Sequence, residues 1–290
     1  MSPSLLRRWL KNGARLFLFI SVILQNVFGE EDDTPISHGR LIEDFPTVDQ
    51  RVLTGAEFRC GSIALGSWLI WLTEKEVLSA PVERKTESSP IFNQAGLTIE
   101  EQAILAEVDT LAGNTGEISL MRLIETLIQY CHRNAGDTGL EIYYYNLPND
   151  NLLHQLVDSE LPVILFQGIY RKNSQSKQLE RQRGHYSCLI GKNGEQLIAN
   201  TYAQNQVFTV EALPMKSLIE NDRYRPTGSE SYLYLRCPPE QYPRYMFRAF
   251  VPSAPQTARK QIFRGTPLFA RPEETILIEG ALAFRVVERH

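Results

Sequence analysis

The sequence predicts an α+β fold in which helices precede a largely antiparallel sheet. Residues 60–72 are apolar on nearly all sides, which is typical of a buried helix, and residues 120–131 carry apolar side chains at helical spacing. Beyond about residue 160 short β-rich runs follow, and Asn193-Gly194 separates two of them as a hairpin turn. With 43% apolar and 22% charged residues, the composition is that of an ordinary globular protein.

Further elements are expected in chain order. Residues 98–112 are rich in Glu, Ala, Ile and Leu and predict a helix, and Ser119 is expected to cap the next one. Residues 151–159 predict a short helix and residues 161–166 a buried strand. The polar and basic segment 171–183 is expected to be a mobile loop. Other strands are predicted at 141–145, 185–191, 196–202, 206–210, 231–237, 244–251 and 275–287.

The first 29 residues differ from the rest of the chain. Basic residues precede an apolar run over 16–24, and no acidic residue occurs before Glu30. Val27 and Gly29 are small enough for the −3 and −1 positions of a cleavage site. The run is shorter than the ~20 residues that a membrane-spanning helix needs. We therefore expect a signal peptide over 1–29 and export to the periplasm or the exterior; an uncleaved membrane anchor is the alternative.

Charge and cysteine content argue against several classes of function. Lys and Arg number 30 and Asp and Glu 34, so no basic excess exists to neutralise nucleic-acid phosphates. Four cysteines in 290 residues are too few for a disulfide framework. The chain has no Cys/His cluster with metal-ligand spacing and no glycine-rich phosphate loop, so we expect neither a metal nor an organic cofactor.

The predicted hairpin brings a histidine close to an amide. If Asn193-Gly194 forms the two-residue turn, the register places His185 and Asn200 diagonally on one strand face, within reach of each other. Thr201 then lies on the other face. A one-residue bulge would overturn this arrangement. A strand histidine without a chemical role is the alternative interpretation.

Cys60 opens the apolar helix and is the candidate nucleophile. Unpaired N–H groups at a helix N-terminus favour the thiolate, which is the reactive form, and a nearby histidine completes an ion pair. His185 and Asn200 follow Cys60 by 125 and 140 positions, close to the roughly 130–150 of papain-type enzymes. The alternative is a small buried residue, the interpretation that we give Cys131 and Cys188.

Around these residues the chain resembles the papain-like peptidases that process double-glycine leader peptides, and their wider peptidase-like relatives. Residues 58–65, Phe-Arg-Cys-Gly-Ser-Ile-Ala-Leu, resemble the Cys-Gly opening of that family, and residues 114–120 resemble its second helix entry. Residues 161–165 resemble its Pro-Val-Ile strand, and Gly-His at 184–185 resembles its histidine strand. Residues 198–201 stand where the family has a turn of the Asn-Asp-Pro type.

The resemblance implies a papain-like fold with the helix of Cys60 packed against an antiparallel sheet. It spans residues 48–213, which are therefore the expected peptidase-like domain. The expected signal peptide is followed by an acidic, proline-containing linker over 30–47. A strand-rich C-terminal extension is expected over 214–290.

The function that follows is an exported cysteine peptidase or amidohydrolase acting on a peptide or protein. Cys60 would attack the carbonyl, His185 would move the proton and Asn200 would hold the imidazole ring. The Cys60 N–H would supply one oxyanion donor, and Gln50 is the candidate for the second. The family's oxyanion-stabilising Gln is missing just before the Cys, because residues 51–59 contain no Gln or Asn. That departure favours a catalytically inactive peptide-binding module as the alternative. A transglutaminase-type acyl transferase would use the same three residue types.

Overall fold

The computed structural model describes residues 39–46, 48–49, 59–79, 96–113, 118–134, 139–213, 245–250, 260–264, 271 and 273–287. All of them belong to one unit, residues 38–290. The expected signal peptide over 1–29 and the candidate oxyanion residue Gln50 lie outside the described residues. None of the described helices is long and apolar enough to cross a membrane.

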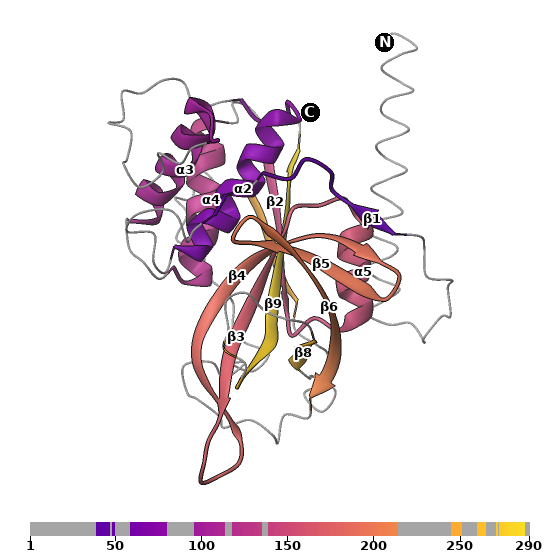
Figure 1. The fold of residues 1–290 in the computed structure, drawn as a ribbon. Helices are drawn as coiled ribbons and strands as arrows, with labels where there is room; N and C mark the ends of the chain where they lie inside the picture. Colours follow the sequence, from indigo (N-terminus) through magenta and orange to yellow (C-terminus); the bar gives the residue numbers. More distant parts are fainter. Residues whose placement is uncertain are drawn as a thin grey trace. The chain divides into compact units, whose positions relative to one another are not determined.

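Four helices occur in the described part of the chain: α2 (Cys60–Glu74), α3 (Ile99–Ala112), α4 (Leu120–Asn134) and α5 (Asp150–Asp158) (Figure 1). Helix α2 is buried on most of its circumference, as its apolar sequence predicts. Helix α3 begins with a capping box of Thr98 and Glu101 and ends at Gly113, whose φ of 93° suits glycine. These helix starts and stops follow from residues that are neighbours in the sequence.

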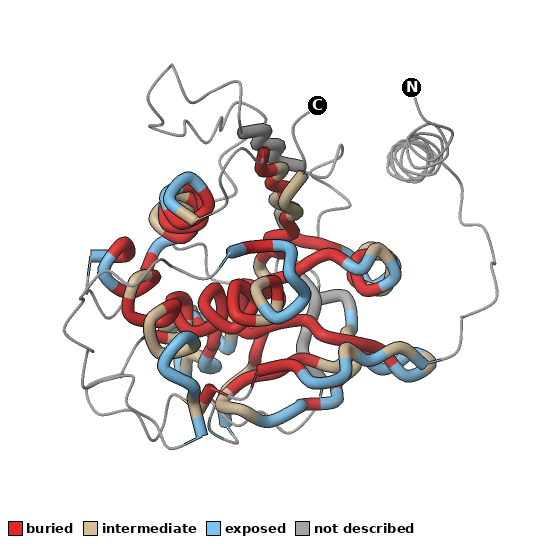
Figure 2. Tube along the Cα trace, turned by 90° about the horizontal axis from the view of Figure 1, so that it is seen from above, coloured by how far each residue is buried: buried red, intermediate tan, exposed pale blue. Residues whose placement is uncertain are grey.

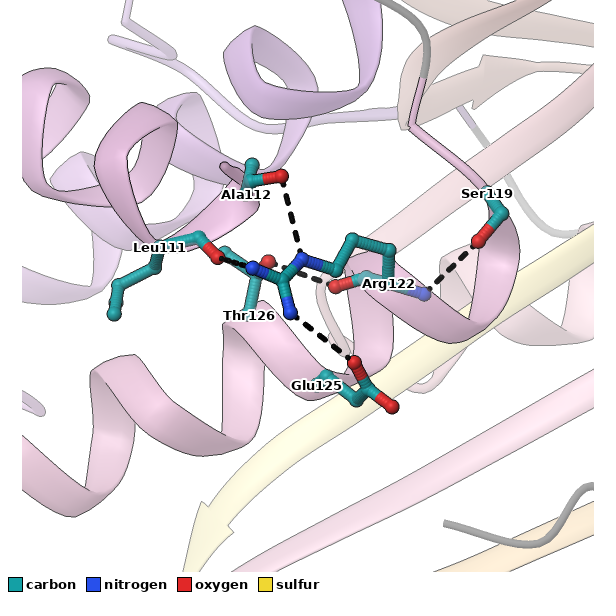
Figure 3. Close-up of polar contacts among 6 residues, drawn as sticks. All are labelled: Leu111, Ala112, Ser119, Arg122, Glu125 and Thr126. Atoms are coloured by element: carbon teal, nitrogen blue, oxygen red, sulfur yellow. Dashed lines mark hydrogen bonds and ion pairs between the residues drawn. The ribbon is translucent and has the colours of Figure 1, made fainter. Parts of the chain in front are cut away.

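Arg122 joins the end of α3 to the start of α4 (Figure 3). The Ser119 Oγ accepts a hydrogen bond from the Arg122 backbone N–H at 3.2 Å, which confirms the expected cap. The Arg122 guanidinium donates to the carbonyl oxygens of Leu111 at 2.6 Å and Ala112 at 3.3 Å. Both carbonyls lie in the last turn of α3, so one side chain binds the end of one helix while its backbone begins the next.

Nine strands are described, and most of their pairings are antiparallel (Figure 1). They are β1 (Arg40–Leu41), β2 (Gly139–Asn146), β3 (Val163–Lys172), β4 (Leu179–Asn193), β5 (Gln196–Thr201), β6 (Gln204–Leu213), β7 (Tyr245–Phe250), β8 (Lys260–Arg264) and β9 (Glu274–Val287). Antiparallel pairing links β3, β4, β5, β6, β8 and β9 in that order, and β9 pairs back with β3. These six strands therefore close a barrel, to which β2 and β7 add on one side of β9.

The main apolar core lies between the helices α2, α3 and α4 and one face of the strands (Figure 2). Alternate residues of β3, β4 and β9 contribute to it, and Trp68 of α2 is fully buried there. The Trp68 indole Nε1 donates to the Val163 carbonyl at 3.0 Å, which ties α2 to β3. The opposite face of the same strands lines the interior of the barrel.

The structure confirms the α+β class, and strands of its sheet also occur outside the expected domain of residues 48–213. The expected linker over 30–47 includes β1, and Phe45 packs edge-on against Trp68 with 4.8 Å between ring centroids. The expected extension over 214–290 includes β9, which pairs with β2 and β3. The described strands in both segments pair within the main sheet. Their partners lie far away in the sequence, so local patterns do not indicate them.

The expected loop over 171–183 is instead the extended end of the β3–β4 hairpin (Figure 1). Two of its basic residues form ion pairs with β9. Arg181 Nε lies 2.9 Å from Glu279 Oε1, and Arg183 Nη1 lies 2.7 Å from Glu274 Oε1. Two of the basic side chains in this segment therefore bind acidic residues of a neighbouring strand in the same sheet.

Candidate functional site

Cys60 is the first residue of α2, as expected, and its side chain is half-buried. The preceding Arg59 is buried and forms an ion pair with Asp109 of α3. Burial raises the pKa of the Asp109 carboxyl, while the charge and hydrogen bond of Arg59 oppose that shift. This buried pair fixes the start of α2 against α3 and so determines where Cys60 lies.

The first turns of α2 rest on the even-numbered residues of β4. A Cβ built at Gly61 would lie 3.2 Å from the Tyr186 ring and 2.0 Å from Ile118, so only glycine allows this approach. Cys188 Sγ donates to the Ala64 carbonyl at 3.3 Å. Tyr186 and Cys188 therefore occupy the side of β4 that faces the helix.

His185 consequently points to the opposite side, because successive side chains of a strand alternate. It is 5% exposed, and its Nε2 lies 2.7 Å from the Thr201 Oγ1. Beside it the Ser187 hydroxyl donates to the Gln167 Oε1 at 3.0 Å. Burial, and then the nearby charge of Arg183, lowers the pKa of His185 to about 3, so the imidazole is neutral at physiological pH.

The expected pairing of His185 with Asn200 is wrong. The turn lies one residue later than expected, at Gly194-Glu195, and Gly194 has a φ of 59°. This shift of the turn alone would leave His185 and Asn200 on the same face of the hairpin. A bulge between Leu189 and Gly191 then reverses the parity, so Asn200 lies opposite Cys188. Thr201, which the predicted register places on the other face, is the residue beside His185.

The structure therefore does not bring Asn200 to the imidazole of His185. Helix α2 with Cys60 lies on one side of β4, and the imidazole of His185 lies on the other. The Asn200 side chain donates to the Asn205 Oδ1 at 2.8 Å within the β5–β6 hairpin. The arrangement offers a thiol at a helix N-terminus and, separately, a buried neutral histidine held by a threonine hydroxyl.

A second polar cluster, not anticipated from the sequence, surrounds Glu279. Glu279 is the extra residue of β9 at a register shift against β3. Its neighbours Gly280 and Ile278 lie opposite Phe166 and Gln167. Its carboxylate accepts hydrogen bonds from the Tyr170 hydroxyl at 2.6 Å and from Arg181 Nη2 at 3.0 Å. A Cβ at Gly168 would lie 2.3 Å from the same carboxylate, so glycine makes room for it. The sequence feature that could have indicated this cluster is the Glu-Gly pair inside the apolar run of residues 275–284.

Comparisons with known proteins identify no relative of this chain: no protein-family model, curated protein or solved structure matches it. Within the described ranges, no group of three or more His, Cys, Asp and Glu side chains is arranged to hold a metal ion.

Proposed function

We propose that this chain is a non-hydrolytic peptide-binding module built on a papain-like scaffold, and that it is exported. The scaffold is supported by the order of the motifs around Cys60 and His185 and by the packing of α2, which begins at Cys60, against antiparallel strands. One observation favours binding over hydrolysis. The imidazole of His185 lies on the side of β4 that faces away from α2.

A thiol peptidase needs its imidazole within hydrogen-bond reach of the thiol, so that the proton can be exchanged between them. Here the His185 Nε2 is engaged by Thr201 at 2.7 Å. The low pKa of His185 also disfavours the imidazolium that would stabilise a thiolate. On the side of β4 that faces α2, the Tyr186 hydroxyl donates to the Ile118 carbonyl at 2.7 Å and supplies no base.

The competing function is the cysteine peptidase or amidohydrolase itself. The position of Cys60 at the N-terminus of a 15-residue helix favours it, because the helix dipole stabilises a thiolate there. That property is independent of His185. A measurement that separates the two functions must therefore test the coupling between thiol and imidazole and not merely the reactivity of the thiol.

The test is the rate of Cys60 alkylation against pH, with the labelled residue identified by mass spectrometry. We expect the same apparent pKa for Cys60 in the wild type and in His185→Ala. Thr201→Val is a second variant that perturbs His185 with a smaller change in volume. An apparent pKa that rises in both variants, together with peptide hydrolysis that disappears in Cys60→Ala, would establish the peptidase instead.

Export has its own test. The basic residues, apolar run and small residues of 1–29 support a cleaved signal peptide. Mass spectrometry of the exported protein should find a chain that begins at or near Glu30. Recovery of intact residues 1–29 in a membrane fraction would mean that the segment is an anchor.

A further inference from the structure

A short N-terminal segment lies along the edge of β4 where β3 ends. Residues Gly39–Ile42, which we name the strap, include β1. Pairing of β3 with β4 stops at Cys188, and the strap continues along that edge, with Arg40 opposite Lys192 and Leu41 opposite Gly191. The Ile42 N–H donates to the Ile190 carbonyl at 2.9 Å. The strap thus acts as a short added strand on an otherwise open edge.

Gly191 is shaped for this strand. A Cβ at Gly191 would lie 2.5 Å from the Arg40 carbonyl oxygen, 2.9 Å from Leu41 Cα and 3.1 Å from Leu41 Cδ1. These three nearest atoms all belong to the strap. A side chain at position 191 would therefore clash first with a strand that lies along this edge.

The end of α5 supplies complementary charge. Arg40 forms an ion pair with Glu160, and its Nη1 donates to the Asp158 carbonyl at 3.0 Å. Lys192, directly opposite Arg40, is 4% exposed and its Nζ lies 2.7 Å from the Asp158 Oδ2. Two cations facing each other across a strand pair repel, and two acidic residues, Asp158 at the end of α5 and Glu160 just beyond it, compensate them. The edge therefore favours a basic residue at the position of Arg40.

An apolar cavity of about 90 Å³ lies under the strap. Its apolar lining comes from Ile42, Trp71, Val157, Leu161, Leu189 and Ile190, and the Arg40–Glu160 pair lies at its rim. The cavity is partly open to the surface, and an apolar side chain inside it would gain dispersion contacts with these walls. A side chain larger than isoleucine at the position of Ile42 would fill it.

The strap is separable from the rest of the N-terminal segment. It has only two residues in regular strand pairing, and Leu41 is 44% exposed. Two residues beyond Ile42, Asp44 has a φ of 58°, and Phe45 is then anchored on Trp68. Residues 39–42 can therefore leave the edge while the core contact of Phe45 persists.

We propose that the strap is displaceable, and that the edge of β4 beneath it binds an extended peptide of another protein by strand addition. The peptide carries an arginine two positions before a bulky apolar residue, which takes the place of Ile42. This assignment locates the site of the proposed peptide-binding module and rests on that function. The strap acts as an intramolecular competitor at an effective concentration on the order of millimolar.

The experiment uses the full chain and a fluorescein-labelled peptide with the sequence of residues 38–44, followed by fluorescence anisotropy. Arg40→Glu should release the strap and bind the peptide at least tenfold more tightly than the wild type. Adding Gly191→Ala to that variant should weaken binding at least tenfold. A peptide with glutamate in place of the arginine should also bind at least tenfold more weakly, whereas phenylalanine at the position of Ile42 should tighten binding.

Equal affinity of the wild type and Arg40→Glu, or binding that survives Gly191→Ala, would overturn the proposal. If Arg40→Glu does not fold, hydrogen exchange on the wild type decides: excess peptide should speed exchange of the Ile42 amide, and unchanged exchange would overturn it. A wild type that dimerises without peptide, and loses the dimer in Gly191→Ala, would assign the edge to a second copy of the strap. Because Cys60 alkylation is a separate readout, failure here leaves the proposed lack of hydrolysis standing.

Discussion

The two faces of β4 place consecutive side chains in different surroundings. On the helix face, Tyr186 and Cys188 pack against α2 in the main apolar core. On the barrel face, His185 and Ser187 are buried as well but have polar partners, Thr201 and Gln167. Stability therefore depends on apolar volume on one face and on hydrogen bonds and protonation on the other. A histidine whose neighbours along the strand contact the helix need not face the helix itself.

The largest effect is expected on the helix face. Trp68→Ala removes a fully buried indole and its hydrogen bond to Val163, which should lower the free energy of unfolding by roughly 3–5 kcal/mol. Urea denaturation measures it. Ile99→Ala is the matched control, because Ile99 is 83% exposed and its truncation should change stability by less than about 0.5 kcal/mol. A loss at Trp68 as small as the control would show that this face is not tightly packed.

The barrel face should make the protein sensitive to acid. The pKa of His185 is lowered from 6.5 to about 3 by burial, so below pH 6.5 the unfolded chain binds a proton that the folded chain does not. Stability is full above that pH and falls as the pH drops toward 3, by roughly 2 kcal/mol between pH 7 and pH 5. Denaturation at several pH values should show this slope in the wild type and a shallower one in His185→Gln. Identical slopes would mean that His185 is not buried as a neutral group.

The register of the β4–β5 hairpin can be tested by a pair of variants. Thr201→Val removes the hydroxyl that pairs with His185 in the barrel and should cost roughly 1–2 kcal/mol. Asn200→Ala removes a partly buried contact to Asn205 and should cost less. Thr201→Val should also shift the His185 C–H resonances in an NMR titration, and Asn200→Ala should not. The reverse order of effects would restore the register without a bulge.

The smallest effect is expected where only local interactions are involved. Ser119→Ala removes the cap of α4 and should lower stability by about 1 kcal/mol, without altering either face of β4. Thermal denaturation checks the loss, and Ser119→Asp is the conservative variant that should restore it. A cost several times larger would indicate that Ser119 takes part in packing between the helices and the sheet.

Helices were predictable because their signals connect residues close in sequence. The apolar stretch that opens at Cys60, the cap at Ser119 and the segment 98–112 each correspond to a helix near its expected bounds. The strand interiors were also recognised: the expected strand over 161–166 overlaps the start of β3. These patterns did not determine which strands pair, or which residues lie opposite each other in a pair.

The sequence by itself thus determined the α+β class, the helix starts and the position of Cys60 at a helix N-terminus. Only the tertiary structure decided which side of β4 His185 occupies and that β9 closes the barrel. The physical reason is that strand parity has a period of two, so one extra residue at the Leu189–Gly191 bulge exchanges Asn200 for Thr201 beside the imidazole. Gly191 is a local sign that a bulge is possible there, but the strands packed around the hairpin decide which residues then lie opposite each other.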